Sequence, residues 1–96
     1  MMWESEKMNQ GEAERIATQV ISFLSQDDSI LERFLALTGW TPAALRSEAG
    51  RSAFFTSVLE FLLSDESLLL AFSANSGTPP QAVTNAHSLL AKHTLL

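Results

Sequence analysis

The sequence contains no cysteine and few basic residues. Without cysteine, disulfides, zinc ribbons and thiolate catalysis are excluded, and a reducing cytoplasm is the expected compartment. Six Lys and Arg residues against eleven Asp and Glu residues give a net charge of −5. This sign opposes contacts with the phosphates of nucleic acid and with anionic membrane surfaces. We therefore expect neither nucleic acid nor a membrane as a partner.

A long apolar run is also missing. The most apolar stretch, residues 57–72, is interrupted by Glu60 and by Asp65-Glu66, and it is too short to cross a bilayer. The first ten residues, MMWESEKMNQ, lack the basic and apolar segments of a secretory signal. Residues 1–10 are therefore predicted to be a flexible tail on a cytoplasmic protein.

The composition that is present indicates one helical domain. The chain has 96 residues, of which 46% are hydrophobic and 18% are charged, as in a single domain with one core. Apolar residues recur at helical spacing, as at Ile16, Val20 and Phe23, and no segment alternates as a strand would. An all-α domain over residues 11–96 is expected.

Capping residues divide this domain into six expected helices. Asn9 and Glu12 have the spacing of a capping box, and Gly39 and Gly77 can adopt the left-handed conformation that ends a helix. Acidic residues or Thr-Pro pairs precede most of the other helices. The expected helices run over 11–25, from Asp27 or Asp28 to Gly39, over 42–50, over 52–63, from Ser64 or Asp65 to Gly77, and over 80–92, with residues 94–96 frayed.

An internal repeat is the most informative feature. Aligning residues 16–49 with residues 54–87, at an offset of 38, gives twelve identities in 34 ungapped pairs. The matches fall at core positions, caps and helix stops. Because two units are too few for a solenoid, we expect two tandem three-helix repeats, about 13–50 and 51–88. They would close into a six-helix bundle with approximate pseudo-two-fold symmetry.

Three segments carry a resemblance to a known family. They are RFLALTGWTPAALR (33–46), VLEFLLSDESLLLAF (58–72) and GTPPQAV followed by AHSLL (77–83 and 86–90). With them the chain resembles a family of short bacterial helical proteins defined only as a domain of unknown function (DUF3572). Family members often open the fourth helix with Asp-Pro, where this chain has Arg51-Ser52. The resemblance implies a small helical bacterial protein and brings no catalytic residues.

No pattern of catalytic, cofactor-binding or metal-binding residues is found. Most acidic residues, Asp27 and Asp65 among them, lie at expected helix starts, where they cap and complement the helix dipole. His87 and His93 are six residues apart, so they cannot chelate one metal as an i, i+4 pair would. We expect no enzymatic activity. An enzyme would need a cleft in which His87 meets a carboxylate.

Comparing the two repeats suggests a contact surface instead. At several matched positions the second repeat is apolar and the first is small or polar: Phe55, Leu63, Leu70 and Ala71 stand against Ala17, Ser25, Glu32 and Arg33. Of these, Phe55, Leu63 and Leu70 are the candidate contact residues. Either helix 52–63 is internal, or these side chains form an exposed patch for a partner protein or a second copy. The predicted function is a protein-interaction module or adaptor. The alternative is a binder of a small apolar ligand, such as an acyl chain, between the repeats.

Overall fold

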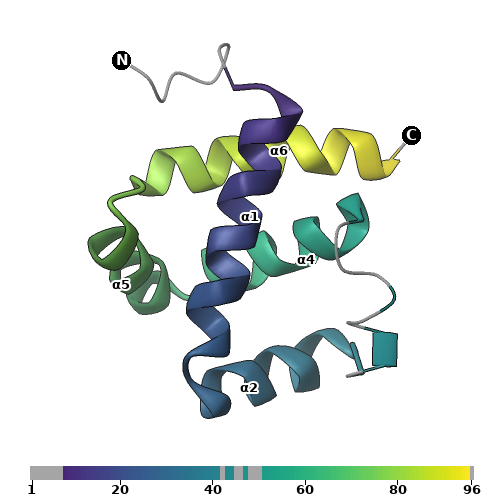
Figure 1. Cartoon of the computed structure of the whole chain (residues 1–96), viewed down its shortest axis with the longest axis vertical. Coiled ribbons are helices and arrows are strands. Elements are labelled where there is room, and N and C mark those ends of the chain that lie inside the picture. The colour runs from purple at the N-terminus through teal and green to yellow at the C-terminus, as the bar shows by residue number, and fades with distance from the viewer. Residues whose placement is uncertain (1–7, 42, 45–46, 48–50, 96) are drawn as a thin grey trace.

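The computed structural model describes residues 8–41, 43–44, 47 and 51–95, and this part of the chain is helical without strands. The all-α expectation is confirmed. Helices are labelled as in Figure 1. Five are delimited: α1 (Gln10–Ser25), α2 (Asp28–Thr38), α4 (Ser52–Leu63), α5 (Glu66–Ser76) and α6 (Pro80–Leu95).

The sixth expected helix falls on the segment that is described least. Of residues 42–50, only Ala43, Ala44 and Ser47 are described, and all three are helical. Thr41 Oγ1 accepts a hydrogen bond from the Ala44 amide at 3.0 Å, the geometry of an N-cap. Because the rest of this segment and residues 1–7 of the expected tail lie outside the described residues, the six-helix bundle of two repeats is not confirmed.

The helix starts confirm the predicted caps. The Glu12 amide donates to Asn9 Oδ1 at 2.8 Å, and the Asn9 amide donates to Glu12 Oε1 at 3.1 Å, which completes the capping box. Asp27 Oδ1 accepts from the Ser29 amide at 3.0 Å, and Asp65 Oδ1 accepts from the Leu68 amide at 3.1 Å. At α4, by contrast, Arg51 occupies the N-cap position without a side-chain capping bond.

Two glycines end helices, as predicted from the sequence. Gly39 and Gly77 follow α2 and α5 with φ of 81° and 77°, in the left-handed region that side chains disfavour. Helix α6 starts at Pro80 as expected but continues to Leu95, so residues 94 and 95 are helical rather than frayed. No described helix is both long enough and apolar enough to span a membrane.

The core lies where α1, α4 and α6 cross, with α2 and α5 packed at their ends (Figure 1). Helix α4 contacts both other central helices, so it is buried around much of its circumference. Its buried residues are Phe54, Phe55, Val58, Leu59, Phe61 and Leu62. Burial on several sides explains why α4 carries Phe55 at the position where α1 carries the smaller Ala17.

Two aromatic pairs join the outer helices to the central ones. Phe34 of α2 meets Phe61 of α4 edge to face, with ring centroids 5.3 Å apart and ring planes at 75°. Phe72 of α5 meets Phe23 of α1 in the same way, at 5.6 Å and 72°. Phe72 and Phe61 lie 38 residues after Phe34 and Phe23, respectively. Each pair therefore contains one ring from each half of the sequence.

Candidate functional site

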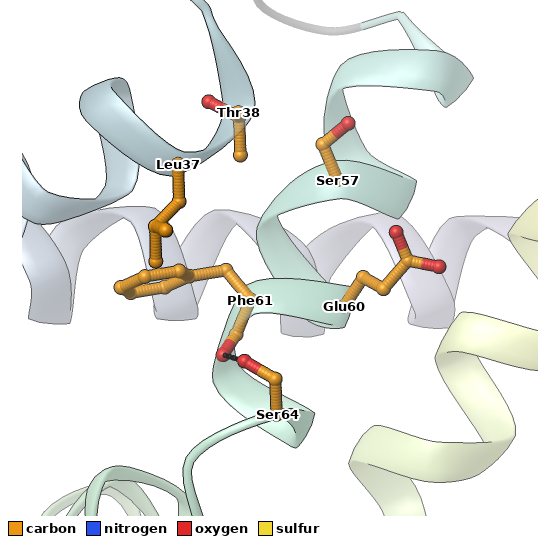
Figure 2. Close-up of a pocket in the computed structure, with 6 residues that line it drawn as sticks. All are labelled: Leu37, Thr38, Ser57, Glu60, Phe61 and Ser64. Atoms are coloured by element: carbon orange, nitrogen blue, oxygen red, sulfur yellow. Dashed lines mark hydrogen bonds between the residues drawn. The ribbon is translucent and has the colours of Figure 1, made fainter.

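A groove of about 340 Å³ opens between α2 and α4. Leu37 projects from the last turn of α2 toward the ring of Phe61, which comes from the facing side of α4 (Figure 2). Leu37 is 70% exposed, which is unusual for so large an apolar side chain. The other lining residues are polar: Thr38, Ser57, Glu60 and Ser64. The groove thus combines an apolar centre with a polar rim.

Two hydroxyl groups of the rim donate hydrogen bonds to backbone carbonyl groups. Thr38 Oγ1 donates to the Phe34 carbonyl and Ser64 Oγ donates to the Phe61 carbonyl, each at 2.7 Å. The Ser64 bond is drawn in Figure 2. Both residues lie at helix C-termini, and the Ser64 amide also donates to the Phe61 carbonyl, at 3.3 Å. These hydroxyls can accept further hydrogen bonds, but their protons are already used.

Charged groups flank the groove on two sides. The Glu60 side chain, 72% exposed, extends toward α6 (Figure 2), where its Oε2 lies 3.5 Å from His87 Nε2. Arg33 of α2 lies over the Phe61 ring, at 5.5 Å from its centroid, and donates to Asp65 Oδ2 at 2.6 Å. The bond from the Leu68 backbone amide, and next the bond from Arg33, lower the pKa of Asp65.

A second groove lies at the matching place between α1 and α5, with a volume of about 220 Å³. Every residue lining the first groove has a counterpart here at an offset of 38 residues. Leu37 is replaced by Asn75, and Glu60 by Ser22. The counterparts are Gln19, Ser22, Phe23, Gln26, Asn75 and Ser76, joined by Phe72. The two grooves therefore share their geometry and differ in chemistry, because the second lacks the exposed leucine and the carboxylate.

The structure does not bring the three predicted partner-binding residues onto one surface. Phe55 is 6% exposed and belongs to the core, which agrees with the alternative that helix 52–63 is internal. Leu63 is half-buried and packs against the core. Leu70, on α5, is 53% exposed. Of the three, Leu70 is the one that solvent reaches freely.

Sequence reasoning missed Leu37, although the repeat contained a signal for it. Only positions where the second half is apolar and the first polar were singled out. The reverse comparison pairs Leu37 with Asn75 and would have found it. The same comparison also pairs Leu35 with Ser73, and Leu35 packs against the core, so the repeat names Leu37 as a candidate without giving its exposure.

His87 lies beside Glu60 at the edge of the groove. His87 Nε2 is buried and has no hydrogen bond, and its 3.5 Å contact with Glu60 is long. An enzyme would require His87 and a carboxylate in one cleft. Glu60 lines the groove, whereas His87 does not. Within the described ranges no group of three His, Asp or Glu residues could hold a metal ion. The side chain of His93 lies outside the described residues.

Comparison with known proteins gives a family and no activity. Residues 10–93 match the family model described as "Protein of unknown function (DUF3572)". No curated protein and no solved structure matches the chain. The family match covers α1, α2, α4, α5, both grooves, and α6 up to residue 93. The chain therefore belongs to the DUF3572 family of proteins of unknown function.

Proposed function

We propose that this chain is a non-enzymatic protein-interaction module of the bacterial cytoplasm, and that it docks a partner protein in the groove between α2 and α4. The observation that carries this proposal is the exposure of Leu37 beside the Phe61 ring. Apolar anchors within a polar rim are the usual composition of a docking site, because the rim excludes water around the anchor.

The charge of the chain favours a basic partner. The net charge is −5, and the most exposed charged group of the groove is the Glu60 carboxylate. A partner that inserts an apolar side chain beside Leu37 and places a Lys or Arg near Glu60 would satisfy both features. Charge complementarity of this kind speeds association and selects among partners. The same charge opposes nucleic acid and anionic membranes as partners.

A non-enzymatic role agrees with the hydrogen bonding of the groove. The protons of Thr38 and Ser64 are donated to carbonyl groups, so neither hydroxyl is paired with a base that could activate it. A docked partner can contact the Thr38 and Ser64 hydroxyls without breaking these hydrogen bonds, whereas nucleophilic catalysis would require a hydroxyl to donate its proton to a base instead.

The architecture that best explains the matched grooves is a duplication. In this proposal residues 13–50 and 51–88 are two three-helix repeats related by a pseudo-two-fold axis, and α5 corresponds to α2. Support comes from α5 starting and ending 38 residues after α2, and from the φ angles of the glycines that follow them, which agree within a few degrees.

Site-specific photo-cross-linking tests the docking proposal. The photoreactive amino acid benzoylphenylalanine is placed at Leu37 in the full chain, and at Asn75, its counterpart, as the matched control. After irradiation in the native host, position 37 should cross-link to one protein of basic composition, and position 75 should not. Equal cross-linking from both positions, or a product consisting of two copies of this chain, would contradict docking of a different protein at this groove.

A second candidate function is binding of a small apolar ligand between the two halves. The observation that favours it is a hollow of about 150 Å³ between α1, α2 and α4, separate from both grooves. Such a site could operate beside the docking groove, because the lining residues of the two do not overlap.

A further inference from the structure

The hollow between α1, α2 and α4 is almost wholly hydrocarbon. Phe34, Phe54 and Val58 are buried, and Ser25 at the rim is exposed. The lining includes Leu24, Ser25, Leu31, Phe34, Phe54 and Val58. None of these side chains is charged. A charged ligand group would therefore lose its hydration without gaining a partner, which restricts the occupant to uncharged apolar groups.

Ser25 adds little polarity to this lining. Its Oγ donates to the Ile21 carbonyl at 2.8 Å, so the hydroxyl proton is already bound within α1. The remaining lone pairs lie at the rim, where water reaches them. A ligand inside the hollow would thus be recognised by shape and by contact with hydrocarbon and aromatic surface, and not by a hydrogen bond.

The matching place in the second half indicates what kind of group fills such a space. Position 63 corresponds to Ser25 and carries leucine, and the Leu63 side chain packs against the core. Phe72 and Val20 correspond there to Phe34 and Val58. The second half thus has a branched hydrocarbon packed against the core at the position where the first half has a serine that lines the hollow.

The volume of the hollow and the arrangement of its two phenylalanine rings indicate the size and kind of ligand that fits. A dry apolar cavity of about 150 Å³ in another protein holds benzene, whereas sites for larger ligands measure about 300–1,000 Å³. Phe34 and Phe54 meet in the wall with centroids 6.3 Å apart and planes at 75°, so they can offer an edge and a face to a third ring. We propose that the hollow binds one uncharged, benzene-sized group, in the form of a small monocyclic aromatic compound. This inference rests on the second proposed function, and it replaces the long acyl chain by a single ring.

Benzene itself is the probe that tests this site. The full chain, labelled at its methyl groups, is titrated with benzene and followed by NMR. The methyl signals of Leu31 and Val58 should shift saturably, and the melting temperature should rise with benzene concentration because the ligand binds the folded state. A chain whose methyl signals do not shift up to the solubility limit of benzene overturns the proposal.

Two variants show whether binding occurs in the hollow. Ser25→Leu copies the residue found at position 63 and should weaken benzene binding at least tenfold. Thr18→Leu adds the same side chain at an exposed position of α1 outside the hollow, and it should bind benzene like the wild type. If Ser25→Leu fails to fold, Val58→Leu fills the hollow from α4 with the same expected loss. Benzene binding unchanged in a folded filling variant overturns the site. Cross-linking from position 37 is unaffected by either result, so failure here is distinct from failure of the docking proposal.

Discussion

The ring of Phe34 meets the ring of Phe61 edge to face at 5.3 Å, and the same contact occurs between Phe72 and Phe23 at 5.6 Å. Because matched residues exchange roles in the two pairs, each half of the chain supplies one outer ring and one central ring. Neither half can complete both contacts within itself. The outer helices are thus held by the opposite half of the sequence, and both grooves lie along these crossed contacts.

The first prediction concerns these rings. Phe34→Ala and Phe72→Ala should each lower the free energy of unfolding by about 3–5 kcal/mol, because both rings are fully buried and their removal leaves cavities. Phe61→Ala should cost more than Phe23→Ala, since Phe61 is buried and Phe23 is half-buried. Urea denaturation measures all four values. A loss below about 1 kcal/mol at Phe34 or Phe72 would be incompatible with the described packing.

The second prediction compares the two aspartate caps. Asp27→Ala should lower stability by about 0.5–2 kcal/mol, as expected for an N-cap. Asp65→Ala should lower it further, because Asp65 also accepts a hydrogen bond from Arg33 across the two halves. Chemical denaturation of both variants in parallel measures the difference. Smaller destabilisation at position 65 than at position 27 would show that the ion pair adds nothing to the cap.

A gain-of-contact variant is the control for this comparison. The residue that corresponds to Arg33 is Ala71, so Asp27 lacks the equivalent ion pair. Ala71→Arg should supply it and raise stability, by no more than about 1 kcal/mol since the pair is exposed. In Asp27→Asn the same arginine should have no effect. An increase that persists in Asp27→Asn would assign the gain to helix propensity instead.

The third prediction is a pH dependence. The pKa of Asp65 is lowered from 3.8 by the Leu68 amide and by Arg33, so the folded state favours the ionised carboxylate. Its stabilising contribution is present above the unfolded-state pKa and is lost as the pH falls through the lower folded-state pKa. The stability difference between wild type and Asp65→Asn should therefore shrink below about pH 4. Thermal unfolding from pH 7 to pH 2 measures it, and a difference independent of pH would refute the assignment.

The fourth prediction concerns the segment between α2 and α4. If residues 13–50 form a three-helix repeat, residues 42–49 should be helical, as residues 80–87 of α6 are. Backbone chemical shifts from NMR report helix directly at each residue. Extended or random-coil shifts throughout 42–49 would exclude the duplicated six-helix arrangement and leave the bundle with five helices.

Helix boundaries were predictable from the sequence because they depend on local chemistry. Asn9, Asp27, Gly39 and Gly77 each act through hydrogen bonds or backbone angles within a few residues of their own position. Such signals do not require knowledge of the packing. The end of α6 was predicted three residues early, since no glycine or proline follows to stop it.

The candidate site was less predictable, because exposure depends on which helices pack together. Phe55 and Leu70 looked alike as apolar excesses of the second repeat, yet one lies between central helices and the other is 53% exposed. Nothing within either helix distinguishes these cases. Likewise, Leu37 continues an apolar helix pattern, and only the position of α4 beside α2 turns it into the wall of a groove.

Mapping the partner on the chain by NMR tests the docking proposal most directly. The protein that cross-links to position 37 is added to the isotope-labelled full chain, and the shifted backbone and methyl signals are assigned. The largest changes should lie at Leu37, Thr38, Ser57, Glu60, Phe61 and Ser64, and the counterparts around Asn75 should remain unchanged. Changes centred on the second groove, or absent from both grooves, would contradict the proposal that the groove between α2 and α4 is the docking site.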